Sequence, residues 1–290
     1  MLSTPRAWCS ILHSDLPKIR DLYLQRSGHC KLHIGPWIPL TFPEEVTRRV
    51  KCIDTNYFEG TDINFSFPSL ERLSVRNVGP SFKTPSITAT SFPLLRHLDL
   101  SNMKREMHAC LLSLPPLESL GIRAQQRDQT WLAMIQGCKT SLKSLYVFIE
   151  TSALVIASTY INLPMLHYLR LQYVNQPPPM SKLHLNVQRL RVYIDSYYDI
   201  DRSLLTNSWQ TITHLRINGK PSLQELTNIR ALQFRLALQD ISQILEELKT
   251  NVVILRHLEG LEFSDYQSNY TQRMTIQALI NEWESDGMGS

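Results

Sequence analysis

The sequence predicts an α/β fold in which short strands join, one after another, a curved parallel β-sheet. Short helices and loops are expected on the outer, convex side. Three observations predict this fold: an apolar template that recurs along the chain, a spacing of mostly 21–25 residues between copies, and prolines just before several copies. The chain has 290 residues, 43% of them hydrophobic, which is enough to bury a large core.

The recurring template is L-x-x-L-x-[LIVF], seen in residues 67–75 (FPSLERLSV) and again in residues 92–100 (FPLLRHLDL). A looser match in residues 50–55 precedes them. The last two apolar positions lie two residues apart, which places both on one face of a strand. A tandem array at this spacing is typical of a leucine-rich-repeat solenoid, in which only a neighbouring repeat covers each apolar edge. The nine copies begin at Leu70, Leu95, Leu117, Leu142, Leu166, Val187, Ile212, Ile229 and Leu258.

Proline supports the same register, because it lacks an N–H and is tolerated where a strand begins but not within a ladder. Two residues before the first apolar position stand Pro68, Pro93, Pro115 and Pro164. The segments between copies have room for a loop and a short helix, and residues 129–138 and 152–161 have helical patterns. One face of the first helix is predicted to carry Trp131, Met134, Ile135 and Cys138.

The pattern divides the chain into three regions. Residues 1–66 hold no clear copy and are expected to cap the N-terminal end, with a helix, a Gly-containing turn and a strand in residues 20–34. Residues 67–268 form the irregular solenoid of about nine repeats. Residues 269–290 are expected to form a C-terminal cap helix, patterned over residues 271–285, and a frayed tail.

Composition and motifs point away from catalysis. The chain has no P-loop, no G-x-G-x-x-G, no H-E-x-x-H and no G-x-S-x-G, so we expect no enzyme, no cofactor and no catalytic residues. The five cysteines lack C-x-x-C spacing and the nine histidines are scattered, so no metal site is expected. The apolar runs are too short to span a membrane and no secretory signal is visible, which predicts the cytoplasm or the nucleus.

The N-terminal region holds two short motifs. The first is a Pro-x-x-Trp segment formed by Pro5 and Trp8, and the second is an L-x-R-S-G-x-C-x-L block formed by Leu24, Arg26, Ser27, Gly28, Cys30 and Leu32. In this order, and followed by irregular leucine-rich units, they resemble fungal F-box proteins with leucine-rich-repeat tails. The resemblance implies recognition of substrates for a Skp–cullin ubiquitin ligase. No F-box precedes Pro5 in this chain, so binding to a Skp-type adaptor is expected only where the full-length product carries one.

The candidate binding surface is the concave sheet face, formed by the variable positions beside the second and third apolar residues. Of 27 such positions eight are Arg and none is Lys. Arg170, Arg191 and Arg216 hold the same slot in three consecutive copies, which predicts a row roughly 10 Å long. The candidate partner-binding residues are Arg170, Arg191, Arg216, Arg189, Arg123, Arg235, Tyr146, Phe148, Tyr168 and Tyr193.

Two functions fit this surface. The first is recognition of a protein substrate, with an acidic or phosphorylated segment as one class of ligand, because guanidinium groups match carboxylate and phosphate geometry. The alternative is a stand-alone leucine-rich-repeat scaffold that binds RNA or an anionic ligand, because Arg and aromatic side chains also stack on bases. The net charge of +4 is mild and does not favour nucleic acid.

Overall fold

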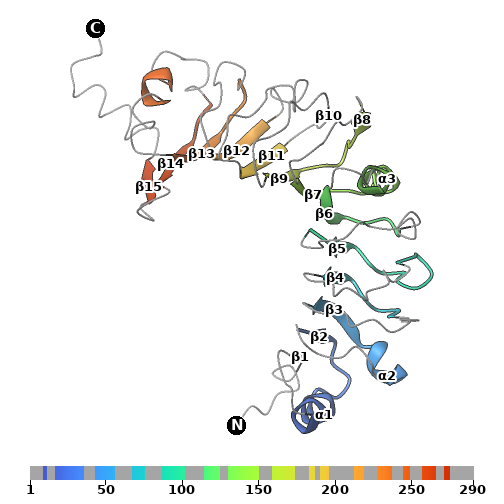
Figure 1. Ribbon diagram of the computed structural model, residues 1–290. Helices are drawn as coiled ribbons and strands as arrows, with labels where there is room; N and C mark the ends of the chain where they lie inside the picture. The colour runs from blue at the N-terminus through green and yellow to red at the C-terminus, as the bar shows by residue number, and fades with distance from the viewer. Residues whose placement is uncertain are drawn as a thin grey trace. The chain divides into compact units, whose positions relative to one another are not determined.

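A computed structural model describes much of the chain (Figure 1). The described residues are 9–11, 17–35, 43–55, 67–75, 87–101, 114–124, 130–149, 159–173, 183–186, 190–195, 212–218, 227–236, 244–248, 257–265 and 271–274. The chain divides into two compact units, Met1–Phe148 and Ile149–Ser290. We call them the N-terminal unit and the C-terminal unit and describe each by itself.

The N-terminal unit is α/β, with a 7-strand parallel sheet and few helices. Its strands lie side by side in chain order, so each new strand is added to the edge left by the one before. Its elements are β1 (Ser10–Ile11), α1 (Pro17–Arg26), β2 (Leu32–Ile34), α2 (Glu44–Thr47), β3 (Val50–Thr55), β4 (Arg72–Val75), β5 (His97–Asp99), β6 (Ser119–Ala124), α3 (Thr130–Gly137) and β7 (Ser144–Ile149).

The core of this unit follows the template predicted from the sequence. Alternate strand residues point to one face, and the second apolar residue of each copy pairs with its counterpart on the next strand. Full burial of such side chains contributes about 1.5–3 kcal/mol each. This row continues into β3, the looser match to the template, and into β2, where no copy was predicted. Its members are at most 2% exposed: Ile34, Ile53, Leu73, Leu98 and Leu120.

Backbone carbonyls where the strands begin hold consecutive strands together. The carbonyl of Glu71 accepts hydrogen bonds from the N–H groups of both Arg96 and His97. The carbonyls of Arg96 and Glu118 each accept two such bonds from the strand that follows. We call this arrangement the carbonyl clamp. One acceptor therefore fixes two consecutive residues of the next repeat, whatever the length of the intervening loop.

The predicted helix in residues 129–138 is confirmed as α3, which contacts β6 and lies on the same side of the sheet as α2 (Figure 1). Its predicted inner face is buried: Trp131, Met134, Ile135 and Cys138 are at most 2% exposed. The Phe-Pro openings of the first two copies also have a packing role. Phe67 and Phe92 stack with ring centroids 6.5 Å apart, while Pro68 and Pro93 lie in turns just before β4 and β5.

The helix, turn and strand predicted for residues 20–34 are α1, a turn and β2. Gly28 takes a positive φ of 53°, a conformation that favours glycine. Ser27 is fully buried, and its hydroxyl donates to the carbonyl of Leu24. Arg49 joins this turn to the start of β3 by donating to Ser27 Oγ (2.6 Å) and to the Cys30 carbonyl (3.1 Å). Within the block at residues 24–32, Ser27, Gly28 and Cys30 therefore hold the turn together.

The C-terminal unit contains a second run of parallel strands in the order β9-β11-β12-β13-β14, closed by an antiparallel β15. A separate two-stranded parallel sheet is formed by β8 and β10. The elements are β8 (Thr159–Asn162), β9 (Tyr168–Tyr173), β10 (Leu183–Asn186), β11 (Leu190–Asp195), β12 (Ile212–Asn218), β13 (Ala231–Leu236), β14 (Gly260–Asp265) and β15 (Thr271–Met274). Within this unit Phe234 and Phe263 stack with centroids 5.7 Å apart.

The predicted register of one strand, β11, is wrong. The copy at residues 187–192 predicts that Leu190 is the second apolar residue, aligned with Leu169 and Leu215. In the structure Val192 pairs with both of these residues, and Leu190 pairs with Ile212. The pairing shifts by one residue after Leu190. The strand therefore sits two residues away from the predicted register.

Two helix predictions in this unit also need correction. Residues 271–274 form β15, antiparallel to β14, where the pattern predicted the start of a cap helix. Residues 159–162 form β8, which replaces the end of the helix predicted over 152–161. The rest of both predicted helices lies outside the described residues.

Candidate functional site

The face of the N-terminal sheet opposite the core carries the variable positions of the repeats. One row in register contains Cys52, Arg72, His97 and Ser119. The next row contains Asp54, Ser74, Asp99 and Gly121. The core row behind them is aliphatic throughout, whereas this face changes charge and size from strand to strand. The scaffold is therefore constant and the exposed face is variable.

Gly121 allows one close contact in this face. A methyl group at its Cα would lie 2.4 Å from Asp99 Oδ1 and 3.0 Å from its Cγ. The same carboxylate oxygen accepts hydrogen bonds from the N–H of Ser101 (3.0 Å) and from its buried hydroxyl (2.6 Å). The missing side chain at Gly121 lets Asp99 hold the turn that follows β5.

A line of charged side chains runs across the sheet where the strands begin. Each member directly follows the first apolar residue of its repeat, and the sign alternates from strand to strand: Lys51, Glu71, Arg96, Glu118 and Lys143. Lys51 pairs with Glu71, and Glu118 pairs with Arg96 (3.2 Å) and Lys143 (3.0 Å). The repeats of the C-terminal unit show the same pairing between Arg230 and Glu259 (3.5 Å). Exposed pairs of this kind add little stability singly.

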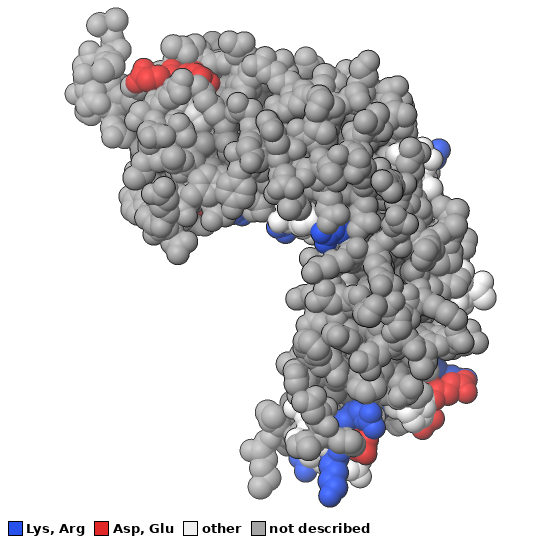
Figure 2. All heavy atoms as spheres, viewed as in Figure 1, with Lys and Arg blue, Asp and Glu red and all other residues white. Residues whose placement is uncertain are grey.

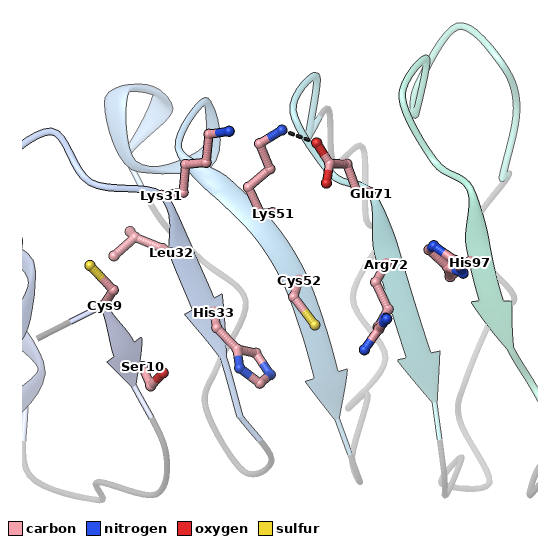
Figure 3. A pocket seen from close by; sticks show the side chains of 10 residues that line it. All are labelled: Cys9, Ser10, Lys31, Leu32, His33, Lys51, Cys52, Glu71, Arg72 and His97. Carbon is pink, nitrogen blue, oxygen red and sulfur yellow. Dashed lines mark hydrogen bonds and ion pairs between the residues drawn. The ribbon is translucent and has the colours of Figure 1, made fainter. Parts of the chain in front are cut away.

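A hollow of about 350 Å³ opens on the variable face of β1 to β5 (Figure 3). Lys31, Lys51 and Glu71 form its rim where the strands begin, and the Lys51–Glu71 pair closes one side. The floor is one row in register across four strands: His33, Cys52, Arg72 and His97. Figure 2 shows basic and acidic side chains next to each other at this end of the unit.

Burial and charge adjust the titrating groups of the hollow. Burial raises the pKa of the Cys52 thiol, with nearby Arg72 acting in the opposite direction. Burial also lowers the pKa of His97, and the positive charge of Arg72 adds to this effect. The hydrogen bond from Lys51 lowers the pKa of the Glu71 carboxyl. At neutral pH these shifts favour a neutral Cys52 thiol, a neutral His97 and an ionised Glu71 carboxylate.

Three predicted binding residues lie together in the N-terminal unit. The guanidinium of Arg123 on β6 lies 4.6 Å from the ring centroid of Phe148 on β7. This is a cation–π contact, which contributes about 0.5–1 kcal/mol at an exposed site. Tyr146 is two residues before Phe148 on β7, so both share its variable face. All three side chains are half-buried.

The predicted row of three arginines does not form. Because β11 sits two residues from its predicted register, Tyr193 pairs with Arg170 on one side and with Arg216 on the other. Arg191 pairs instead with Tyr168 and His214. Beyond Arg216 the same row continues to Gln233 and Glu262, whose side chains are hydrogen-bonded to each other. Two strand spacings therefore separate Arg170 from Arg216.

The remaining candidates are placed only in part. Arg189 lies outside the described residues, and for Arg191, Tyr193 and Arg235 only the backbone position is described. The repeat pattern does not reveal the hollow, because β1 to β3 lie in the region that it predicts to be a cap. A signal was present, however: the alternating charges after the first apolar residue begin at Lys51.

No family model, no curated protein and no solved structure matches the chain. Among the described residues no three His, Cys, Asp or Glu side chains are arranged to hold a metal ion. Within the same part of the chain no helix is both long enough and apolar enough to cross a membrane.

Proposed function

We propose that this chain is a non-catalytic protein-interaction module of leucine-rich repeats, which binds a partner protein through the variable face of its parallel sheet. One observation carries the proposal: in β3 to β6 the buried row of Ile53, Leu73, Leu98 and Leu120 is aliphatic, while neighbouring strands carry different residues in the rows in register on the opposite face. Such a face can change its ligand without changing its scaffold.

The residues on this face support a protein partner. Arg and aromatic side chains are enriched at binding hot spots, and Arg123 lies over Phe148 within the variable face. Where the strands of the N-terminal unit begin, Lys and Arg alternate with Glu and pair with them. RNA would favour an unbroken basic track, so this alternation favours a protein over the RNA alternative.

The resemblance to fungal F-box proteins supports a more specific role. We propose that the module recognises substrates for a Skp–cullin ubiquitin ligase. The supporting residues are those of the block at 24–32, which in this chain build the turn between α1 and β2. The proposal assigns substrate binding to the variable face and adaptor binding to an F-box.

The test is proximity labelling in cells with a biotin ligase fused to the chain. The face variant is Arg123→Ala/Phe148→Ala. The control variant is Arg48→Ala/Leu94→Ala, which removes one arginine and one large apolar side chain, both exposed, away from the variable face. We expect the face variant to lose specific protein partners and the control to keep them, with circular dichroism showing both folded. Identical partner sets for wild type and the face variant would contradict the proposal.

A further inference from the structure

The floor of the hollow has a small side chain between two larger hydrogen-bonding groups. Cys52 on β3 pairs in register with His33 on β2 and with Arg72 on β4. Neighbouring strands are about 4.8 Å apart, so His33 and Arg72 start from backbone positions about 10 Å apart. Figure 3 shows the imidazole and the guanidinium on either side of the thiol. The floor is therefore lowest over Cys52, with a donor on each side.

The charge of the lining favours an anion. Lys31, Lys51 and Arg72 line the hollow, and among its described lining residues Glu71 alone is acidic and pairs with Lys51. The formal charge of the lining is thus positive with the histidines neutral. The neutral Cys52 thiol adds no negative charge to the floor. Asp54, also half-buried, is two residues further along β3 and is not part of the lining.

The donors suit one kind of anion. The guanidinium of Arg72 offers a planar fork, and an imidazole N–H can donate from the other side. A tetrahedral phosphate ester has acceptor oxygens in several directions and carries close to two negative charges at neutral pH. A carboxylate is planar and carries a single negative charge. The lining matches the phosphate better in charge and in the spread of its donors.

We propose that the hollow on β1 to β5 binds a phosphorylated side chain of the partner segment that docks on the variable face. This inference rests on the proposed function and names the ligand chemistry of one part of that face. The phosphate lies over Cys52, between Arg72 and His33, with Lys31 at the rim. A protein segment is favoured over RNA because the lining residues that the structure describes include no Phe, Tyr or Trp on which a base could stack.

The test is fluorescence anisotropy with fluorescein-labelled pentapeptides of glycine around a central phosphoserine, aspartate or serine. We expect the phosphoserine peptide to bind wild type, the aspartate peptide to bind at least tenfold more weakly, and the serine peptide not to bind. Arg72→Gln should weaken binding of the phosphoserine peptide about tenfold or more, since a charged bidentate contact is lost. Arg48→Gln, an exposed arginine on the turn after α2, is the matched control and should change affinity less than twofold.

A second variant tests the place of the phosphate. Cys52→Met fills the floor of the hollow without changing its charge. It should weaken binding of the phosphoserine peptide while the circular dichroism spectrum stays that of wild type. Arg72 is exposed, so Arg72→Gln keeps the proposal testable should Cys52→Met fail to fold. Equal effects of Arg72→Gln and Arg48→Gln would overturn the proposal.

Two further probes separate the sources of phosphate. Inorganic phosphate should compete only weakly, and a labelled single-stranded RNA pentamer should bind more weakly than the phosphoserine peptide. Tighter binding of the RNA would overturn the protein assignment in favour of nucleic acid. Loss of phosphopeptide binding together with intact partner labelling would remove this inference and leave the proposed function standing.

Discussion

The contact between Gly121 and Asp99 makes a quantitative prediction. Gly121→Ala places a methyl group 2.4 Å from Asp99 Oδ1, and the Asp99 backbone Cα is only 3.4 Å away. The carboxylate must therefore move. Movement breaks its hydrogen bonds to the N–H and the hydroxyl of Ser101, a residue that is 0% exposed. The substitution thus acts through the turn after β5 and not through Gly121 itself.

The expected cost follows from those two bonds. A hydrogen bond to a charged group contributes about 1.5–3 kcal/mol, and Asp99 is only half-buried, so the lower end applies. We expect Gly121→Ala to lower the free energy of unfolding by about 2–3 kcal/mol in total. Asp99→Ala breaks the same two bonds and should cost a similar amount. In the double variant the methyl group has no carboxylate to displace, so the two losses should not add.

The assay is urea unfolding followed by the fluorescence of tryptophan, which includes Trp131, buried in α3 of the same unit. With a slope of about 2–3 kcal/mol per molar urea, the midpoint should fall by about 1 M in each single variant. Gly137→Ala is the matched control, since nothing lies within 4 Å of its added methyl group, and it should not lower the midpoint. Additive losses in the double variant would refute the reasoning.

Four other outcomes are expected. Leu145→Ala, at a 0% exposed core position on β7, should lower the free energy of unfolding by about 2–5 kcal/mol in the same urea assay, and a loss below 1 kcal/mol would contradict the burial of this side chain. Gly28→Ala should cost about 1 kcal/mol because φ is positive there, and an unchanged urea midpoint would argue against that conformation. The hydrogen bond from Lys143 lowers the pKa of the Glu118 carboxyl in the folded state. The stability that this shift contributes is therefore present above the ordinary pKa of 4.5 and is lost as the pH falls through the lowered pKa. Glu118→Gln should therefore lose less stability than wild type between pH 5 and pH 3, measured by urea midpoints, and parallel pH profiles would contradict this. Burial raises the pKa of the Cys138 thiol, so mass spectrometry after iodoacetamide treatment at pH 8 should find it alkylated only in urea; rapid labelling of the folded chain would contradict its burial.

The register of β11 shows where sequence reasoning reaches its limit. The segment LRVYID has apolar residues at 190, 192 and 194, so two registers two residues apart put apolar side chains on the core face equally well. The pairing with β9 and β12 selects between them, and this pairing is not encoded within the segment. The buried rows were therefore predictable strand by strand, while the alignment of the exposed rows was not.

The two ends of the chain differ in how well their patterns predicted structure. In the block around Gly28 the helix, the turn and the strand were each predictable, because a glycine after a helical pattern marks its end. Residues 271–274 have a helical pattern but pair with β14, since an open sheet edge offers backbone partners that a local pattern cannot reveal. The hollow was missed for a related reason: its residues come from five strands and become neighbours only through the topology.

The carbonyl clamp has a consequence for how such a chain can change. Because the carbonyl of Glu71 positions both Arg96 and His97, the alignment of each repeat is set by its immediate predecessor and not by the length of the loop between them. In the C-terminal unit the carbonyl of Arg230 holds Glu259 and Gly260 in the same way across the longest interval between copies. Insertions and deletions in the connecting segments can therefore accumulate while the rows of the variable face stay aligned. A lineage that changes the length of these segments therefore keeps the exposed rows of the sheet in place.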